Sequence, residues 1–576
     1  MQRLLYIAVL LSALLLPTTG WATTYYIDNT VGSSGNGLAW ATAWKNATDI
    51  TGLVPGDTVY ISGGPAGQTY TWPLNWAPTS GTAGNPITFA VGQDASHNGI
   101  VTFTNASASG NAWFAPTGVS YVTINGEVSG VRKMTIDPNY TYTCFSINVS
   151  EKHIRILYIT ALDTVYHCKG RYQELAYSYM TGVTPNGQDA LLYQFADDGA
   201  DYPPGAGEAY GLNSIHHNYF EVSRKRNAGL GWDVLIWTEC TDFYNNTLIS
   251  MYDAGYTGGQ HADGLQFAGN YNRIYNNYIE NFQNANIFVE TFQPTLNIQI
   301  FNNTLVALDA AADWGAYSCI IIGNGPPTTN SLTNFVVANN LCIGNTTAPN
   351  LHTGGIHVNT YDKNTWSNSF IYNNLFYGNL ETVADGGTGT HPTTSNNVLD
   401  DAHMAFVNVT GSALYPTIDT HLTAGATAAI GTGLNLTSLG ITALNSDAGA
   451  VARPVTLPWT LGPYGFGDPA PAAPTGQHVA TFTGPTWAVL IWTANTEADF
   501  AGSSVFRSTT SGSYSTTPLA TLTPALAATR RSPITQWFDS TLYTAGTYYY
   551  TIKHYDTGNN LSSASAEVSV TVTGKQ

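Results

Sequence analysis

Residues 244–249 read YNNTLI, and residues 274–279 read IYNNYI. In both stretches an aromatic or aliphatic residue precedes a pair of Asn residues, and alternating apolar residues follow the pair. Asn tolerates the left-handed backbone of tight turns, whereas alternation of apolar residues favours a half-buried strand. Each stretch therefore predicts a strand, a tight turn and a second strand.

The same turn recurs along the middle of the chain. The second residue of each turn is Asn218, Asn246, Asn277, Asn303, Asn340 and Asn374, so the positions advance by 28, 31, 26, 37 and 34 residues. A repeat of this size made of short strands indicates a solenoid. We expect the Asn side chains to stack from coil to coil, because such a ladder satisfies polar groups that would otherwise be buried unpaired.

The composition agrees with a β-rich exported protein. Of the 576 residues only 10% are charged, while 57 are Gly, 35 are Tyr and 14 are Trp. The formal net charge of -18 argues against nucleic acid as a partner, because phosphates require clustered Lys and Arg. An anionic substrate remains compatible with the sequence, since one local basic patch is sufficient to hold a carboxylate.

Three stretches near the N-terminus carry a resemblance to a known group. Residues 25–29 read YYIDN, residues 56–61 read GDTVYI, and residues 81–89 read GTAGNPITF. This order resembles the opening coils of secreted right-handed parallel β-helix proteins of the pectate-lyase-like superfamily. Residues 403–466 resemble the closing cap of the same group. The resemblance implies an all-β, right-handed parallel β-helix and a polysaccharide or cell-surface glycan as partner.

Four segments are expected along the chain. Residues 1–22 have the layout of a secretory signal peptide, with Arg3 before an apolar run and cleavage after Ala22. Residues 23–466 form the β-helix with an N-terminal cap and a closing segment, and residues 467–473 form a Pro/Ala linker. Residues 474–574 resemble an immunoglobulin-like fibronectin type III β-sandwich with Trp492 in its core.

We therefore expect a monomeric protein that is secreted or held at the cell surface. No apolar run of ~20 residues indicates a membrane span. The five cysteines, which are odd in number and widely spread, show neither a disulfide framework nor a zinc pattern. We expect most of them to be buried small hydrophobic residues, and Cys144–Cys168 is the candidate pair for a bridge between neighbouring strands.

One sheet of the expected β-helix is the candidate substrate-binding surface. Its strands are predicted at residues 165–168, 190–195, 233–237, 264–267, 286–290, 318–322 and 355–359. Alternation assigns the outward-facing side chains, which are Trp237, Gln266, Phe288, Glu290 and His357. Flat rings beside amide and carboxylate groups suit a sugar, although an ordinary solvated sheet would show the same pattern.

The loops that precede two of these strands carry the candidate catalytic residues. His261 and Asp263 lie just before the Gln266 strand, and one coil earlier the chain carries the basic triplet Arg224, Lys225 and Arg226. A lyase acting on a uronic-acid polymer needs a base for the proton next to the carboxylate and positive charge for the carbanion-like transition state. His261, Asp263, Lys225 and Arg226 are therefore the catalytic candidates, with Arg224 as a substrate contact. The alternative is a solvated basic loop and a structural His261–Asp263 pair.

Calcium is the cofactor that the resemblance implies. Asp197, Asp198 and Asp201 offer hard oxygen ligands for it, although they lack a complete calcium-loop pattern. Two other functions stay open at this point. One is an inverting glycoside hydrolase that uses Asp263 and Glu290, and the other is a non-catalytic glycan-binding or adhesion protein. Lysis of an acidic glycan by β-elimination is the preferred interpretation.

Overall fold

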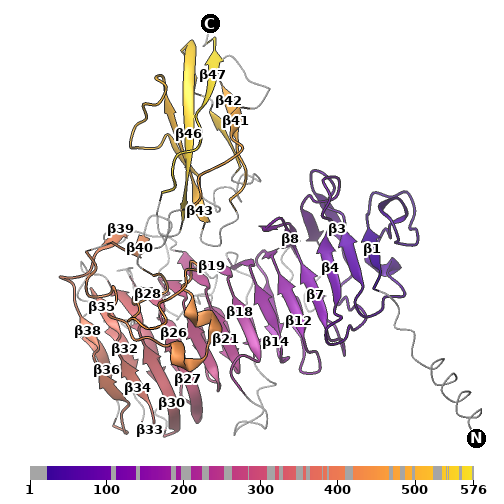
Figure 1. Cartoon of the computed structure of the whole chain (residues 1–576). Coiled ribbons are helices and arrows are strands. Elements are labelled where there is room, and N and C mark those ends of the chain that lie inside the picture. The colour runs from indigo at the N-terminus through magenta and orange to yellow at the C-terminus, as the bar shows by residue number, and fades with distance from the viewer. Residues whose placement is uncertain are drawn as a thin grey trace, which may run out of the picture. The chain divides into compact units, whose positions relative to one another are not determined.

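The computed structural model is built almost wholly of β-strands (Figure 1). It describes residues 22–573, without 105–111, 138–142, 183–189, 196–208, 224–232, 252–262, 283, 308–317, 324–328, 345–353, 359–362, 379–380, 386–387, 409–418, 424, 466–470, 480–486, 496–499, 523–534, 540, 543 and 557–560. The chain divides into two compact units, one up to Tyr179 and one from Met180. The predicted signal peptide lies outside the described residues, except for Ala22.

The first unit is made of three parallel sheets. The first contains β1 (Thr24–Ile27), β2 (Thr58–Ile61), β4 (Ile87–Val91), β7 (Val122–Asn125), β12 (Ile154–Leu157) and β15 (Glu174–Ala176). The second contains β3 (Gln68–Thr71), β5 (Val101–Thr104), β10 (Met134–Asp137) and β13 (Ile159–Ala161), and the third contains β6 (Ala112–Phe114), β11 (Thr143–Ile147) and β14 (Val165–Cys168). The short elements are η1 (Trp40–Thr42), η2 (Ala47–Asp49) and the antiparallel pair β8 (Glu127–Val128) and β9 (Val131–Arg132).

The second unit repeats the pattern in three parallel sheets that we name A, B and C. β16 (Tyr179–Gly182) lies at the start of this unit. Sheet A contains β18 (Asn213–His216), β21 (Thr241–Tyr244), β24 (Asn272–Tyr275), β27 (Thr295–Phe301), β30 (Ser331–Ala338), β33 (Thr365–Ser367), β34 (Phe370–Tyr372) and β37 (Thr393–Ser395). Sheet B contains β19 (Tyr219–Ser223), β22 (Thr247–Met251), β25 (Tyr278–Glu280), β28 (Thr304–Ala307), β31 (Leu341–Gly344), β35 (Leu375–Tyr377) and β38 (Val398–Leu399).

Sheet C completes each coil. It contains β17 (Ala190–Phe195), β20 (Asp233–Thr238), β23 (Leu265–Phe267), β26 (Ala285–Glu290), β29 (Ser318–Gly323), β32 (Gly354–Val358) and β36 (Glu381–Asp385). A chain that passes from sheet to sheet and pairs in parallel with its own next turn is a parallel β-helix. The predicted fold is therefore confirmed, and the strands predicted for the candidate surface lie within a residue or two of their observed bounds.

The second residue of each Asn turn forms the predicted ladder. Nδ2 of Asn246 donates to Oδ1 of Asn277 at 3.2 Å, and Nδ2 of Asn277 donates to Oδ1 of Asn303 at 2.9 Å. The backbone N–H of each residue donates to the same oxygen of the next residue. The series runs from Asn218 to Asn397, which is one coil beyond the predicted pattern. The ladder thus holds successive coils in register.

The first Asn of each pair makes different hydrogen bonds from the second. Asn276, Asn302, Asn339 and Asn373 all have left-handed backbone, with φ between 50° and 58°. Their side-chain amides donate to the backbone carbonyls of Ser446, Gly462, Leu434 and Thr432, respectively. These four acceptors lie far downstream in the chain. The outer Asn column therefore anchors a later segment against the coils.

That later segment, residues 403–465, is named the return segment. It contains the antiparallel pair β39 (Phe406–Asn408) and β40 (Asp419–Leu422), followed by η3 (Thr437–Leu439) and η4 (Thr442–Asn445). Met404, Ala429 and Leu461 pack on the outer face of sheet B. Leu436, Ile441, Leu444 and Trp459 pack on the outer face of sheet A. The segment predicted as a closing cap thus lies along two outer faces of the β-helix, and among the described residues neither cluster includes a residue of sheet C.

The C-terminal residues form a separate sandwich of antiparallel sheets. One sheet contains β41 (His478–Val479), β42 (Ala488–Ile491) and β45 (Gln536–Asp539). The other contains β44 (Ala520–Leu522), β43 (Phe500–Ser508), β46 (Gly546–Asp556) and β47 (Val568–Val572). Trp492 is buried between the sheets, as predicted. Membership of the fibronectin type III family stays a prediction.

The cysteines differ from the expectation. Cys319 in β29 and Cys342 in β31 are joined by a disulfide. Cys144 and Cys168 are free and buried, so the predicted bridge between them is wrong. Burial raises the pKa of both thiols to about 12. Cys240 is also free and buried, as expected for a small hydrophobic residue.

Candidate functional site

The outer face of sheet C carries a row of side chains in register. Gln266 pairs with Phe288, Phe288 pairs with Ile321, and Ile321 pairs with His357. The residues on either side of Gln266 and Phe288 in the sequence are fully buried in the core of the β-helix. Gln266, Phe288 and His357 themselves are half-buried. Their half-buried positions between fully buried neighbours agree with the outward faces predicted for these three residues.

Glu290 faces outward from the same strand as Phe288. It is half-buried, and in the next coil it pairs with Gly323. Because Gly323 has no side chain, the strand beside Glu290 places no atoms over its carboxylate from that position. Gly323 is itself buried, so other parts of the chain cover this position.

Trp237 does not lie in the row to which it was assigned from the sequence. The residue that pairs with Gln266 is Ile236. Trp237 follows with a φ of 64°, and its ring packs against Phe292 with a centroid distance of 5.3 Å and an interplanar angle of 63°. The structure thus keeps Trp237 on the rim of sheet C but beside Phe292 rather than beside Gln266.

Phe292 is not among the residues that the sequence pattern indicated. It lies two residues after Glu290 and is 37% exposed. The available signal was weak, because Phe292 follows the predicted strand and alternation assigns no face to a residue in a turn. Its contact with Trp237 depends on the stacking of coils, which a single sequence does not specify.

Asp263 is buried at the start of the Gln266 strand. Its carboxylate accepts hydrogen bonds from the backbone N–H of Ala285 at 2.8 Å and from Nδ2 of Asn284 at 3.0 Å. Its own backbone N–H donates to Oδ1 of Asp233 at 2.6 Å. A fully buried carboxylate with these partners links three successive coils. Its contacts are those of a structural residue that fixes the end of the preceding loop.

Asp263 and Glu290 are not brought together. Leu265 pairs with Ile287, so Asp263 is level with Ala285, five residues before Glu290. Five residues of a strand span about 16 Å, whereas the two carboxylates of an inverting glycosidase lie about 6.5–9.5 Å apart. The two acids therefore do not flank one glycosidic bond, and the geometry does not favour the hydrolase.

The remaining predicted residues lie outside the described part of the chain. They are His261, Arg224, Lys225, Arg226, Asp197, Asp198 and Asp201. Across the residues that the structure describes, no group of three or more His, Cys, Asp or Glu side chains is arranged to hold a metal ion. Within the same residues, no helix is long and apolar enough to cross a membrane.

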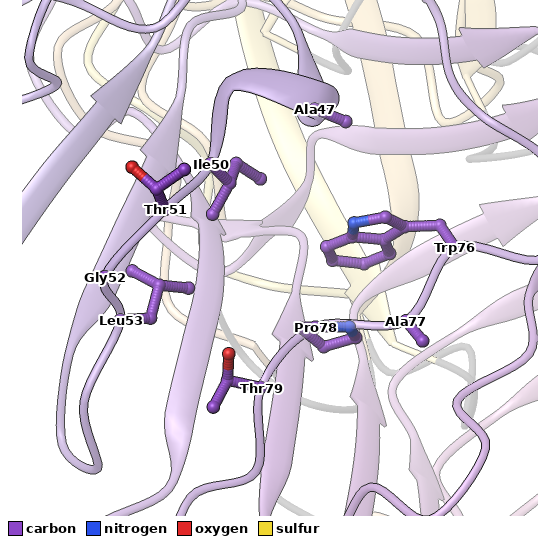
Figure 2. A pocket seen from close by; sticks show the side chains of 9 residues that line it. All are labelled: Ala47, Ile50, Thr51, Gly52, Leu53, Trp76, Ala77, Pro78 and Thr79. Carbon is purple, nitrogen blue, oxygen red and sulfur yellow. The ribbon is translucent and has the colours of Figure 1, made fainter.

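A separate hollow of about 180 Å³, which no sequence pattern predicted, lies in the first unit. Figure 2 shows the Trp76 indole on one side of it and Ile50, Thr51 and Leu53 on the other. The nine lining residues are Ala47, Ile50, Thr51, Gly52, Leu53, Trp76, Ala77, Pro78 and Thr79. None of the nine is titratable, so the lining side chains offer no general acid or base.

Comparisons with known proteins give remote likenesses. No family model and no curated protein matches the sequence. A GH136 lacto-N-biosidase from Eubacterium ramulus is 13% identical with a TM-score of 0.36, and the match covers 65% of this chain and 68% of that one. A pectate lyase is 13% identical with a TM-score of 0.31, covering 78% of this chain and 98% of that one. An Fn3-like protein from Clostridium thermocellum is 28% identical with a TM-score of 0.14, covering 18% of this chain and 92% of that one. None of these likenesses is close enough to identify the activity of this chain.

Proposed function

We propose that the protein is an exported enzyme that binds a polysaccharide along the outer face of sheet C and cleaves an acidic, uronate-containing glycan by β-elimination. The observation that carries the proposal is the in-register row from Gln266 through Phe288 to His357. This row follows three coil steps, or about 14 Å, which is long enough to contact several sugar residues of one chain.

The chemistry of the row suits a glycan. The Phe288 ring offers an apolar surface to the C–H faces of a sugar, while Gln266 and His357 offer hydrogen-bonding groups to its hydroxyls. The return segment packs on sheets A and B. Sheet C is therefore the sheet whose outer face is best placed to receive a long polymer.

The catalytic groups of the proposal come from the two loops that enter neighbouring strands of this sheet. His261 is assigned as the base that removes the proton next to the uronate carboxylate. Lys225 and Arg226 stabilise the negative charge that develops, and Arg224 contacts the substrate. Asp263, whose carboxylate is buried, acts as a positioning residue that fixes the end of the loop carrying His261. Calcium held by Asp197, Asp198 and Asp201 is part of the same proposal.

The test is a panel of acidic and neutral polysaccharides read in two ways. A lyase gives products with the ultraviolet absorbance of an unsaturated uronate, and this signal disappears in His261→Ala and Lys225→Ala. A chelator lowers the activity and added calcium restores it. Reducing ends without the absorbance would show a hydrolase, and binding without either signal would show a non-catalytic glycan-binding protein.

The binding surface is tested separately from the chemistry. Gln266→Ala and His357→Ala should weaken retention by the substrate polysaccharide without abolishing folding. Gln299→Ala is the matched control, because Gln299 is a half-buried Gln that faces outward from sheet A. Equal weakening by Gln266→Ala and Gln299→Ala would exclude the outer face of sheet C as the binding surface.

A further inference from the structure

Trp237 interrupts the alternation of its strand. Because Ile236 pairs with Gln266, a regular strand would place Trp237 level with Phe267, which is fully buried in the core. The backbone of Trp237 is instead left-handed, with a φ of 64°. This conformation costs a bulky residue roughly 1–3 kcal/mol, and the turn residues Tyr158, Tyr177 and Tyr271 of this chain also adopt it. The strand thus accepts backbone strain while the indole stays half-buried at the rim.

The indole reaches across one coil to meet a second ring. Phe292 follows β26, whereas Trp237 lies in β20, and β23 runs between these strands in the sheet. The coil between them contributes the small residue Ala268 just after β23. The two rings pack edge to face. In this arrangement the ring that contributes its edge has neither of its flat faces covered by the other ring. This arrangement presents an aromatic surface beside the row on sheet C.

Glu290 gives the aromatic surface a polar neighbour. It lies two residues before Phe292 and is half-buried. A carboxylate accepts hydrogen bonds from the hydroxyls of a sugar. It also repels another carboxylate at short range. The combination of rings and carboxylate therefore favours a neutral pyranose over a uronate.

We infer that Trp237, Phe292 and Glu290 form a subsite for a neutral pyranose at the end of the outer face of sheet C. The inference rests on the proposed function, since it assumes that a glycan lies along this face. It narrows the substrate class to a glycan that carries a neutral sugar next to the uronate at which the chain is cleaved.

The alternative to a ligand-binding role is that the two rings only pack against each other to stabilise the fold. The two roles predict different effects of Trp237→Gly on the thermal midpoint. Gly adopts a φ of 64° without strain, so Trp237→Gly relieves the backbone while it removes the ring. If the ring serves the ligand, Trp237→Gly should leave the thermal midpoint unchanged or raise it while weakening binding. If the ring serves the fold, the midpoint should fall by several degrees.

The experiment uses the full chain and measures its retardation in gels that contain pectin, alginate, glucuronoxylan or galactomannan. We expect the tightest retardation in glucuronoxylan, which has neutral sugars beside uronates. In that gel Trp237→Gly and Phe292→Ala should each weaken binding at least about tenfold, the equivalent of ~1.4 kcal/mol. Trp237→Tyr should restore most of the affinity because it keeps a ring. Phe370→Ala is the control, because Phe370 on sheet A is 36% exposed and so resembles Phe292.

The possible outcomes distinguish failure of the subsite from failure of the proposed function. If no gel retards the wild-type protein, the proposed function fails and the subsite fails with it. If glucuronoxylan retards the wild type, Trp237→Gly and Phe292→Ala equally, the subsite is wrong and the binding surface stands. A lowered thermal midpoint in Trp237→Gly would also overturn the subsite, and so would preferred binding of the fully uronate polymer alginate that is lost in both variants.

Discussion

The guanidinium of Arg453 donates a hydrogen bond from Nη2 to Oδ1 of Asn276, 177 residues earlier in the chain, at 3.0 Å. The same nitrogen donates to the carbonyl oxygens of Gly462 and Pro463 at 3.1 Å. The guanidinium also lies over the ring of Trp459, 5.2 Å from its centroid. Burial lowers the pKa of Arg453 to about 10, so the residue remains charged at neutral pH. A single buried cation thus ties the return segment to the outer Asn column.

Arg453→Met should release the return segment. The substitution keeps an apolar side chain but removes the buried hydrogen bonds of the guanidinium to Asn276, Gly462 and Pro463, at a cost of about 3 kcal/mol. Urea unfolding measures the loss, and limited proteolysis should cut within residues 403–465 sooner than in the wild type. Arg155→Met is the control, because Arg155 pairs with Glu174 at a largely solvent-accessible site and should contribute less than ~1 kcal/mol. Equal losses in the two variants would contradict the proposed role of Arg453.

A substitution in the buried Asn ladder should lower the free energy of unfolding more than a substitution at an exposed Asn turn. Nδ2 of Asn303 donates to the carbonyl of Ile274 and to Oδ1 of Asn340, and its Oδ1 accepts from Asn277. Asn303→Ala removes these buried hydrogen bonds and should lower the free energy of unfolding by about 3 kcal/mol.

The comparison for the ladder is Asn368→Gly. Asn368 is exposed and left-handed, with a φ of 47°, and donates to Oδ1 of Asn334. Gly fits this backbone, so the change should cost less than ~1 kcal/mol. Chemical denaturation of both variants gives the two values. A cost for Asn303→Ala no larger than that for Asn368→Gly would mean that the ladder does not hold the coils together.

The sequence contained enough to predict the ladder and the faces of sheet C. Both follow from local rules, since Asn at a recurring turn must find hydrogen-bond partners and alternation assigns sides to a regular strand. Asn246 and Gln266 could therefore be assigned correctly from a single sequence. The outer role of Asn276 could not, because its partner Ser446 is 170 residues away and nothing local marks it.

The misplacement of Trp237 has a related cause. Ile236 is the residue of that strand that lies level with Gln266, so the assignment of Trp237 to the row was one residue out of phase, and the left-handed backbone at Trp237 keeps the indole out of the core. The role of Asp263 was equally ambiguous, because an Asp just before the Gln266 strand suits both a catalytic acid and a buried acceptor of backbone N–H groups. Only the packing of neighbouring coils shows that Asp263 is fully buried.

Thiol labelling should separate the five cysteines into two groups. Cys144 and Cys168 are buried thiols whose pKa burial raises to about 12, so neither supplies thiolate at neutral pH. The native protein should therefore resist iodoacetamide. After denaturation without reductant, the free thiols Cys144, Cys168 and Cys240 should react, and reductant should expose Cys319 and Cys342 in addition. Mass spectrometry counts the adducts, and labelling of Cys319 before reduction would contradict the disulfide.

His217 should make the stability of the second unit depend on pH. Burial, together with the adjacent His216, lowers the pKa of His217 to about 4 from its ordinary value of 6.5. Nδ1 of His216 lies 2.8 Å from Nδ1 of His217, and Nε2 of His217 contacts the Asn245 amide at 3.1 Å. The folded state therefore favours neutral His217, whereas the unfolded chain binds a proton at a higher pH.

The sign of the effect follows from proton binding. Between pH 6.5 and pH 4 the unfolded state binds more protons at this residue than the folded state does. Stability should thus fall as the pH is lowered through this window, by up to about 1.4 kcal/mol per pH unit, with the full contribution present above pH 6.5. His217→Asn removes the titrating group and fits the turn, because Asn245 and Asn276 occupy the same position in later coils with the same left-handed backbone. Unfolding at pH 7 and at pH 4.5 should show the wild type losing about 2 kcal/mol more than His217→Asn. Equal losses would mean that His217 titrates alike in the folded and unfolded chains.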